Sequence, residues 1–293
     1  MKNNALPKKM MALVLAALLF NSYTHAIVIR HDKPASEYLA NVNDFPPLAT
    51  FYNIGVHGTL IAPQWILTAA HTVFCLNEGQ LIKVGNELVE VKARYSYPSY
   101  KLGGKNDLAL IQLKAPVTHV RPAKLYREKD EHRKAVWFIG SGGTGTGLTG
   151  ETVGYKENNS VLRKAQNEVE KVTNSDLRFI FESGNDGLDL EGVSGNGDSG
   201  GPAFIKSESE YYLLGVSSRT GSWFKDVGEY GVKELYTRVS THAEWIDSVM
   251  TANETERLTL SSPKRFLQSG MTTENISQVC ETIGFKSHTE NNR

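Results

Sequence analysis

Short apolar segments separated by turn residues limit the fold of this chain more than any other feature. Between Ile27 and Val239 these segments are bounded by Gly, Pro, Asn or charged residues, and none has the length of a typical helix. The pattern is typical of β-strands, and many short strands joined by Gly- and Pro-rich turns predict an all-β sandwich or barrel. The predicted strands include 59–62, 65–69, 81–84, 88–91, 108–113, 136–139, 203–205 and 211–216.

A helical pattern is confined to the C-terminal part of the chain. Ser240 can cap a helix over 241–250, because four apolar residues of that segment recur on one face. A second short helix is predicted over 273–283, within a more polar tail that begins at residue 251. The four residues that define the apolar face of the first helix are Ala243, Ile246, Val249 and Met250.

The first 26 residues have the pattern of an export signal. A basic start with three lysines precedes an apolar run over 10–20, and Thr24 and Ala26 stand three and one before the predicted cut. The apolar run is shorter than the roughly 20 residues that a membrane span needs. We therefore expect a signal peptide over 1–26 and a secreted or periplasmic protein without a membrane anchor. The alternative is an uncleaved amphipathic N-terminus.

The charge balance of the chain gives no support to two classes of partner. Lys and Arg together number 32, as do Asp and Glu, so the formal net charge is zero. Such a balance does not indicate a nucleic-acid or membrane-surface partner. Hydrophobic residues make up 40% and charged residues 22% of the 293 residues, which is ordinary for a globular protein. We expect a monomer with one large domain or two small ones.

The chain has two cysteines, Cys75 and Cys280. An exported protein can form a disulfide, and a bridge between these two would tie the C-terminal tail to the body of the protein. Two unpaired buried thiols remain the other interpretation.

Three segments carry residues with catalytic chemistry. They are Leu-Thr-Ala-Ala-His over 67–71, Asn-Asp-Leu-Ala-Leu over 106–110 and Gly-Asn-Gly-Asp-Ser-Gly-Gly-Pro over 195–202. In this order they resemble the signature segments of the trypsin/chymotrypsin family of serine proteases. The resemblance implies two packed six-stranded antiparallel β-barrels, over about 27–130 and 131–250. A C-terminal helix would close this peptidase domain of residues 27–250, and an extension over 251–293 would follow it.

The resemblance also implies a catalytic triad of His71, Asp107 and Ser199. A serine hydroxyl is a weak nucleophile until a base removes its proton, and an imidazole can do so near neutral pH. The aspartate would hold the imidazole in the required tautomer and stabilise its cation, and Ser218 would donate a hydrogen bond to that carboxylate. The backbone N–H groups of Gly197 and Ser199 would form the oxyanion hole. The expected reaction is the hydrolysis of protein or peptide substrates through an acyl-enzyme, without a metal or other cofactor.

Activation in this family implies a further pair of residues. Ile27 follows the predicted signal cut, and its free amine would pair with Asp198 and fix the loop that carries the oxyanion donors. Signal removal would then generate the active N-terminus without a separate pro-segment. The sequence departs from the family at Ile29 and Arg30, which replace two usual glycines.

The resemblance places the substrate pocket around six residues. Val193 replaces the aspartate that selects Arg or Lys in trypsin, and Thr220 replaces a glycine that keeps the pocket open. These changes favour a shallow pocket for small or medium apolar side chains. In an ungapped match Glu234 lies at the pocket base and would instead attract a basic side chain, whereas Gly231 takes that place if the loop is longer. This second preference therefore stays open. The six residues are Val193, Ser194, Ser218, Arg219, Thr220 and Glu234.

Other interpretations fit the sequence less well. A catalytically silent, protease-like binding protein would lose a triad residue, and none is lost. An α/β-hydrolase elbow at Ser199 requires a helix after the serine, whereas strand-like sequence follows. His71 and Cys75 have a spacing that zinc ligands can have, but two more nearby ligands are missing. Glycines 140, 142 and 145 fit a dinucleotide-binding spacing, but poor helix formers follow them, so a flexible surface loop is predicted there.

Overall fold

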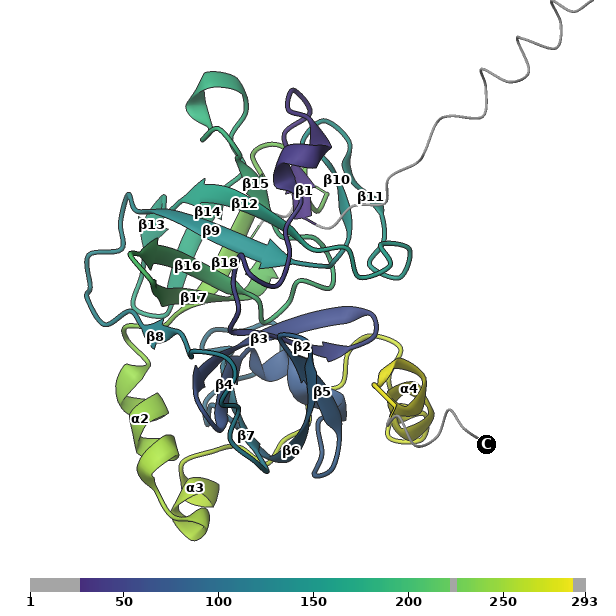
Figure 1. The fold of residues 1–293 in the computed structure, drawn as a ribbon, viewed down its shortest axis with the longest axis vertical. Coiled ribbons are helices and arrows are strands. Elements are labelled where there is room, and N and C mark those ends of the chain that lie inside the picture. Colours follow the sequence, from purple (N-terminus) through teal and green to yellow (C-terminus); the bar gives the residue numbers. More distant parts are fainter. Residues whose placement is uncertain (1–26, 222–225, 287–293) are drawn as a thin grey trace, which may run out of the picture.

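The computed structural model describes residues 27–221 and 226–286, and these residues form a mostly β protein with a few helices near the C-terminus. The chain folds into two halves that lie one above the other (Figure 1). The expected mostly β, chymotrypsin-like architecture is confirmed, with a closed six-stranded barrel in one half and a curled, half-barrel sheet in the other.

The first half is a closed barrel with the strand order β2-β3-β4-β7-β6-β5. Its neighbouring strands pair antiparallel throughout. A register shift lies between Leu60 and Ala62 in β3 and another between Val91 and Ala93 in β6, and such bulges help a sheet to curl. The strands are β2 (Leu48–Tyr52), β3 (Gly55–Ala62), β4 (Trp65–Thr68), β5 (Leu81–Val84), β6 (Glu87–Ser96) and β7 (Ala109–Leu113).

The second half is built on an eight-stranded sheet with the order β12-β9-β16-β17-β18-β14-β13, in which β8 pairs with β17. All pairs are antiparallel except that between β8 and β17. The strands are β8 (Lys124–Leu125), β9 (Ala135–Gly140), β12 (Arg163–Glu168), β13 (Lys171–Val172), β14 (Asp176–Ile180), β16 (Pro202–Ser207), β17 (Glu210–Thr220) and β18 (Lys233–Arg238).

A four-stranded sheet with the order β11-β10-β1-β15 lies beside this half. It brings the start of the described chain, β1 (Ile27–Ile29), between β10 (Thr144–Thr146) and β15 (Gly192–Val193), while β11 (Gly150–Val153) forms the edge. The first residues therefore belong to the second half, although the sequence places them in the first barrel. The glycine-rich segment over 140–150 is the expected surface loop only in part, because Leu148 and Thr149 are exposed whereas 144–146 form β10. Ser141, Thr144 and the glycines between them are buried.

The helices follow the expected positions with one correction. The first is α2 (Ala243–Thr251), and its N-cap is His242 and not Ser240, whose hydroxyl donates to Glu131 Oε1 at 2.5 Å. The predicted second helix is α4 (Ile276–Ile283).

One helix, α3 (Glu254–Thr259), was not predicted from the sequence. It starts at a capping box in which Asn253 accepts from the backbone of Glu256 while Glu256 accepts from the backbone of Asn253. Three short 3-10 helices complete the described elements, η2 (Ala35–Tyr38), η3 (Ala70–Cys75) and η4 (Gly184–Asp186).

A buried apolar cluster joins the two halves. It combines Leu67 and Leu110 of the first barrel with Val216 of the second half and Ile246 of α2. Burial of large aliphatic side chains stabilises such a junction by about 1.5–3 kcal/mol for each residue. The cluster fixes the two halves against each other, which matters because the candidate site takes residues from both.

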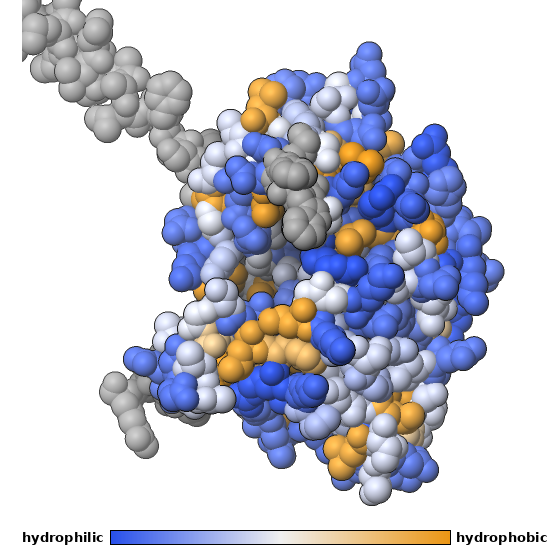
Figure 2. Space-filling model, turned by 180° about the vertical axis from the view of Figure 1, so that it is seen from behind, coloured by the Kyte–Doolittle hydropathy of each residue, from blue (hydrophilic) through white to orange (hydrophobic). Residues whose placement is uncertain are grey.

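Two further observations concern the termini and the surface. The predicted signal peptide over 1–26 lies outside the described residues, and none of the described helices has the length and apolar character of a membrane span. Seen from behind, most of the surface is hydrophilic, and a contiguous apolar patch lies on the half that contains the first barrel (Figure 2).

Candidate active site

His71 and Asp107 form a close pair at the junction of the two halves. His71 is the second residue of η3, which begins two residues after the end of β4. Asp107 stands two residues before β7, which pairs with β4. The Nδ1 atom of His71 lies 2.6 Å from Asp107 Oδ2, and the backbone N–H of His71 donates to Asp107 Oδ1 at 3.0 Å. Because a carboxylate can only accept a hydrogen bond, the ring proton of His71 lies on Nδ1. The other ring nitrogen, Nε2, can then accept a proton.

The Asp107 carboxylate is buried and fully engaged. Its side chain is 2% exposed, and Ser218 of β17 donates to Oδ2 at 2.8 Å. Thr237 of β18 donates to the Asp107 carbonyl at 2.9 Å, which anchors the same residue to the second half. A buried carboxylate requires such donors, because an unsatisfied charge in the interior is costly. The structure therefore brings His71, Asp107 and Ser218 together as the sequence predicts.

Ser199 lies in the loop between β15 and β16 and lines a cavity of about 250 Å³. Among the described residues, the His71 ring is hydrogen-bonded only to Asp107, so no hydrogen bond joins Ser199 to the pair. Catalytic hydrogen bonds are often long before substrate binds. The cavity is lined by Ser194, Gly195, Asn196, Ser199, Ser217, Ser218, Arg219, Thr220, Val227 and Glu234.

Five of the six predicted pocket residues line this cavity, and Val193 does not. Its side chain is fully buried in a cluster with Val28 of β1 and with Phe181 and Val232. Arg219 is fixed by bonds to Ser218 Oγ at 3.2 Å and to Asp176 Oδ1 at 3.0 Å. The cavity walls are therefore more polar than expected for a pocket that binds apolar side chains.

Glu234 supplies a buried carboxyl group to the cavity. It is 3% exposed and accepts from the backbone N–H of Ser194 at 3.1 Å. Burial raises the pKa of the Glu234 carboxyl to about 8, because a charge is poorly solvated there. The side chain is thus mostly protonated at neutral pH.

Asp198, next to Ser199, is the second buried carboxyl group of this region. Its oxygens accept from the backbone N–H groups of Gly142 at 2.6 Å and Gly195 at 2.9 Å, and Ile27 contributes a further backbone hydrogen bond. Burial raises the pKa of Asp198 to about 7, and these hydrogen bonds oppose the rise. A Cβ atom on Gly142 would lie 2.7 Å from the carboxyl carbon, so this close approach requires glycine.

The N-terminal segment is held firmly in this region. Ile27 and Val28 are buried, and a Cβ atom on Gly228 would lie 2.5 Å from the Val28 side chain. Arg30, which replaces a usual glycine, binds Asp32 with Nε and Nη2 and the carbonyl of Leu188 with Nη1. The departure from the family pattern is therefore accommodated by contacts with neighbouring residues.

His57 forms a second contact between a histidine and a carboxylate, but with a different character. Its Nε2 lies 3.8 Å from Asp198 Oδ1 and accepts from the backbone N–H of Ser141 at 3.0 Å. Burial lowers the pKa of His57 to about 4, so the ring is neutral at physiological pH. Because its side chain is 0% exposed, this histidine cannot meet a substrate.

Two contacts of this region were not predicted from the sequence. Glu151 of β11 accepts from the backbone N–H of Asn196 at 2.6 Å and so holds the loop before Ser199. Gln268, in the C-terminal tail, donates from Nε2 to the carbonyl of His71 at 2.6 Å. Neither residue lies in a recognisable motif, and no pattern in the sequence indicates that they approach the site.

Comparison with known proteins assigns the family. The family model described as Trypsin matches residues 37–246. A serine protease, SSP1 of Scolopendra subspinipes, is 28% identical over 240 residues, which cover 71% of this chain and 78% of that protein. The complement C1s subcomponent of Sus scrofa is 26% identical over 250 residues, which cover 73% of this chain and 35% of that protein. The chain therefore belongs to the trypsin family and is a serine-type endopeptidase.

Proposed function

We propose that this endopeptidase cleaves peptide bonds with a triad of His71, Asp107 and Ser199. The observation that carries the proposal is the His71–Asp107 hydrogen bond of 2.6 Å beside the cavity that Ser199 lines. With its proton held on Nδ1, the imidazole can accept the Ser199 proton on Nε2 while the hydroxyl oxygen attacks the carbonyl carbon. The imidazolium then protonates the leaving amine, and water hydrolyses the acyl-enzyme by the same route.

The proposed oxyanion hole consists of the backbone N–H groups of Gly197 and Ser199. Gly197 has a φ of +95°, a conformation that favours glycine. The carbonyls of these two residues accept from the backbone N–H groups of Val56 at 2.7 Å and His57 at 2.9 Å. Strand β3 thus ties the loop to the first barrel, which supports donors that are oriented before the reaction.

We further propose that cleavage before Ile27 activates the enzyme. The Ile27 backbone nitrogen already bonds to Asp198, and Ile27 has a φ of +60°, which is rare for a β-branched residue. Such a conformation costs on the order of 1–3 kcal/mol, and cleavage of the preceding peptide bond removes the constraint. The new ammonium group would then give the buried Asp198 carboxylate the cation that it lacks.

The proposed specificity depends on the state of Glu234. While its carboxyl group is protonated, the small polar cavity favours uncharged side chains of small or medium size. Once it is ionised, the same group would attract Lys or Arg. This accommodates both preferences that the sequence leaves open.

Export to an oxidising compartment, secreted or periplasmic, is the proposed location. The Cys75–Cys280 disulfide supports it, because such bonds persist outside the reducing cytosol. The signal peptide over 1–26 and a monomeric state remain part of the proposal.

The Ser199→Ala variant tests the proposed function. Hydrolysis of peptide amides is expected to fall by about 10⁶-fold, because the nucleophile is removed. Labelling by a fluorophosphonate, which requires an activated serine, is expected to disappear as well. Ser277→Ala, on the exposed side of α4, is the matched control and should behave as the wild type. Hydrolysis at the wild-type rate in Ser199→Ala would refute the assignment.

A further inference from the structure

The C-terminal tail lies beyond the residues that the trypsin family model matches, which end at 246. Residues 261–286, here called the strap, run from the end of α3 across the first barrel to α4 (Figure 1). Backbone bonds fasten both ends of the strap. Ser262 donates to the Ser96 carbonyl at 2.8 Å, and Asn53 donates to the Ile283 carbonyl at 2.8 Å.

The strap also completes the core of the first barrel. Phe266, Ile276 and Ile283 are each 7–8% exposed and belong to the same apolar cluster as Val73 and Phe74 of η3. The strap therefore packs against the helix that carries His71. Burial of this kind excludes water from the underside of η3 and limits its motion.

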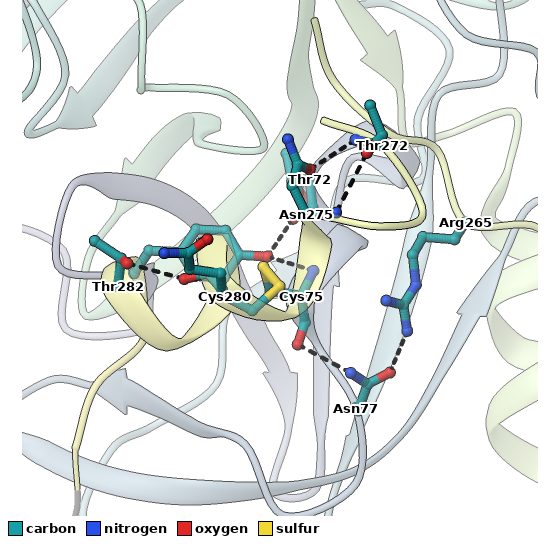
Figure 3. The surroundings of a disulfide bond; sticks show 10 residues. Thr72, Cys75, Asn77, Arg265, Thr272, Asn275, Cys280 and Thr282 are labelled. Atoms are coloured by element: carbon teal, nitrogen blue, oxygen red, sulfur yellow. Dashed lines mark hydrogen bonds between the residues drawn. A yellow bond between two sulfur atoms is a disulfide. The ribbon is translucent and has the colours of Figure 1, made fainter. Parts of the chain in front are cut away.

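A covalent bond adds to this packing. Cys280 of α4 is joined to Cys75, the last residue of η3, although the two lie 205 residues apart in the sequence. Figure 3 shows the disulfide between α4 and η3, with the hydrogen bond of 2.7 Å between Arg265 and Asn77 beside it. The cross-link restricts how far the strap can separate from η3.

The strap contacts the backbone of His71 itself. Gln268 is half-buried, and its Nε2 donates to the His71 carbonyl at 2.6 Å. The backbone N–H of His71 donates to Asp107, so both polar groups of the His71 backbone are held by side chains. The next carbonyl, that of Thr72, accepts from the Tyr52 hydroxyl at 2.7 Å.

The strap also touches the segment that leads to Asp107. The ring of Phe266 packs edge-on against that of Tyr100, with the centroids 4.6 Å apart. Burial raises the pKa of the Tyr100 phenol, and the charge of Asp107 raises it further, which indicates that the phenol lies near this carboxylate. One segment of chain therefore supports both partners of the His71–Asp107 pair.

We propose that the strap positions the histidine for catalysis and that Gln268 is the positioning residue. The inference rests on the proposed function, in which His71 is the general base. Asp107 fixes the rotation of the imidazole ring, and Gln268 fixes the backbone from which the ring projects. A displacement of about 1 Å between reacting groups can cost about 10²-fold in rate, so this support affects turnover more than substrate binding.

The test compares two substitutions of Gln268 that differ in hydrogen bonding. Gln268→Met keeps the length of the side chain and removes the donor, and Gln268→Lys restores a nitrogen donor with similar reach. For Gln268→Met we expect kcat on a peptide amide to fall about tenfold, with KM within about twofold of the wild type. Gln268→Lys should recover most of the lost kcat. Gln278→Met, on the exposed side of α4, is the matched control and should leave kcat unchanged.

Thermal unfolding separates positioning from a general loss of structure. The melting temperature of Gln268→Met should stay within about 3 °C of the wild type, because only one hydrogen bond is lost. An unchanged kcat in Gln268→Met, an equal loss in Gln268→Lys, or a fall in kcat that follows a large fall in melting temperature would each overturn the proposal.

A Ser199→Ala sample measured beside these variants distinguishes the two proposals. If Ser199→Ala is inactive and Gln268→Met keeps the wild-type kcat, the strap proposal alone is overturned. If Ser199→Ala remains active, the triad assignment fails, and the catalytic role of the strap fails with it.

Discussion

The two sides of the candidate site differ in how completely their charges are satisfied. On the first-barrel side, the Asp107 carboxylate accepts from the His71 backbone, the His71 ring and Ser218. On the other side, the only hydrogen-bond donors to the Asp198 carboxyl group among the described residues are backbone N–H groups. Of the described residues, only His57 forms an ion-pair contact with Asp198, and burial keeps that ring neutral.

This difference indicates that the two sides become competent at different stages. The His71–Asp107 hydrogen bond is already formed in the unprocessed chain. The disulfide and the strap hold the η3 segment that carries His71. In the proposed activation, the loop that carries Ser199 depends on Asp198, whose buried carboxyl group would gain a cationic partner only when cleavage creates the ammonium group of Ile27. We infer that proteolytic processing acts mainly on the serine side of the site.

Replacing Asp107 disrupts the His71–Asp107 pair on the first-barrel side of the site. We expect it to lower activity more than replacing Asp198 or Glu234 does. Asp107→Asn keeps the shape of the side chain, but an amide nitrogen can face Nδ1 and favour the wrong tautomer of His71. We expect kcat to fall about 10⁴-fold. Steady-state hydrolysis of a peptide amide measures this.

The processing state provides the control for Asp107→Asn. The fold loss should be the same whether the chain begins at Ile27 or carries one additional residue before it. Asp247→Asn, at an exposed ion pair with Arg127, should change activity less than twofold. A loss confined to the processed form would contradict the idea that this side forms independently.

Replacing Asp198 tests the serine side of the site, which is proposed to depend on processing, and should have a smaller effect than replacing Asp107. Asp198→Asn leaves the new ammonium group of Ile27 without a charged partner. Removing one member of a buried pair costs about 3–5 kcal/mol, so kcat/KM of the processed enzyme is expected to fall between about 10²-fold and about 5,000-fold. The measurement compares variant and wild type, each beginning at Ile27.

The unprocessed chain again serves as the control. In a form with one residue added before Ile27, Asp198→Asn should change the already low activity less than about threefold, because no ammonium group is present to pair. If the substitution lowers both forms equally, Asp198 supports the loop without an activation pair. If processed Asp198→Asn keeps wild-type activity, the proposed pairing is wrong.

Local patterns in the sequence predict much of this architecture. Short apolar runs indicate the strands because a half-buried strand needs only a few apolar residues, and segments such as 81–84 coincide with observed strands. The Cys75–Cys280 bridge could be stated only as one of two outcomes, since spacing alone does not reveal proximity. α3 could have been found from its capping box, where Asn253 is followed by Glu256 three residues later.

Contacts between distant segments could not be predicted in the same way. The pairing of β1 with β10 and β15 places Val193 against Val28, so a residue counted toward the pocket is buried elsewhere. The glycines near 142 make room for Asp198, which a count of helix formers cannot reveal. Gln268 lies in a polar tail without a motif, and its contact with His71 depends on how the whole strap packs.

Glu234, on the serine side of the site, provides a test of substrate specificity. Its expected effect on kcat/KM is the smallest of the three predictions. Its pKa of about 8 means that the ionised fraction in the free enzyme rises about tenfold between pH 7 and pH 9. The ratio of kcat/KM for an arginine substrate to that for a valine substrate should rise by about the same factor, because only the carboxylate attracts the basic side chain. Taking the ratio cancels every effect of pH on the catalytic steps that the two substrates share. In Glu234→Gln the ratio should be independent of pH and close to the low-pH value of the wild type, because the amide never ionises. A ratio that still rises with pH in Glu234→Gln would assign the effect to another group, and a flat ratio in the wild type would show that the carboxyl group does not reach the bound side chain.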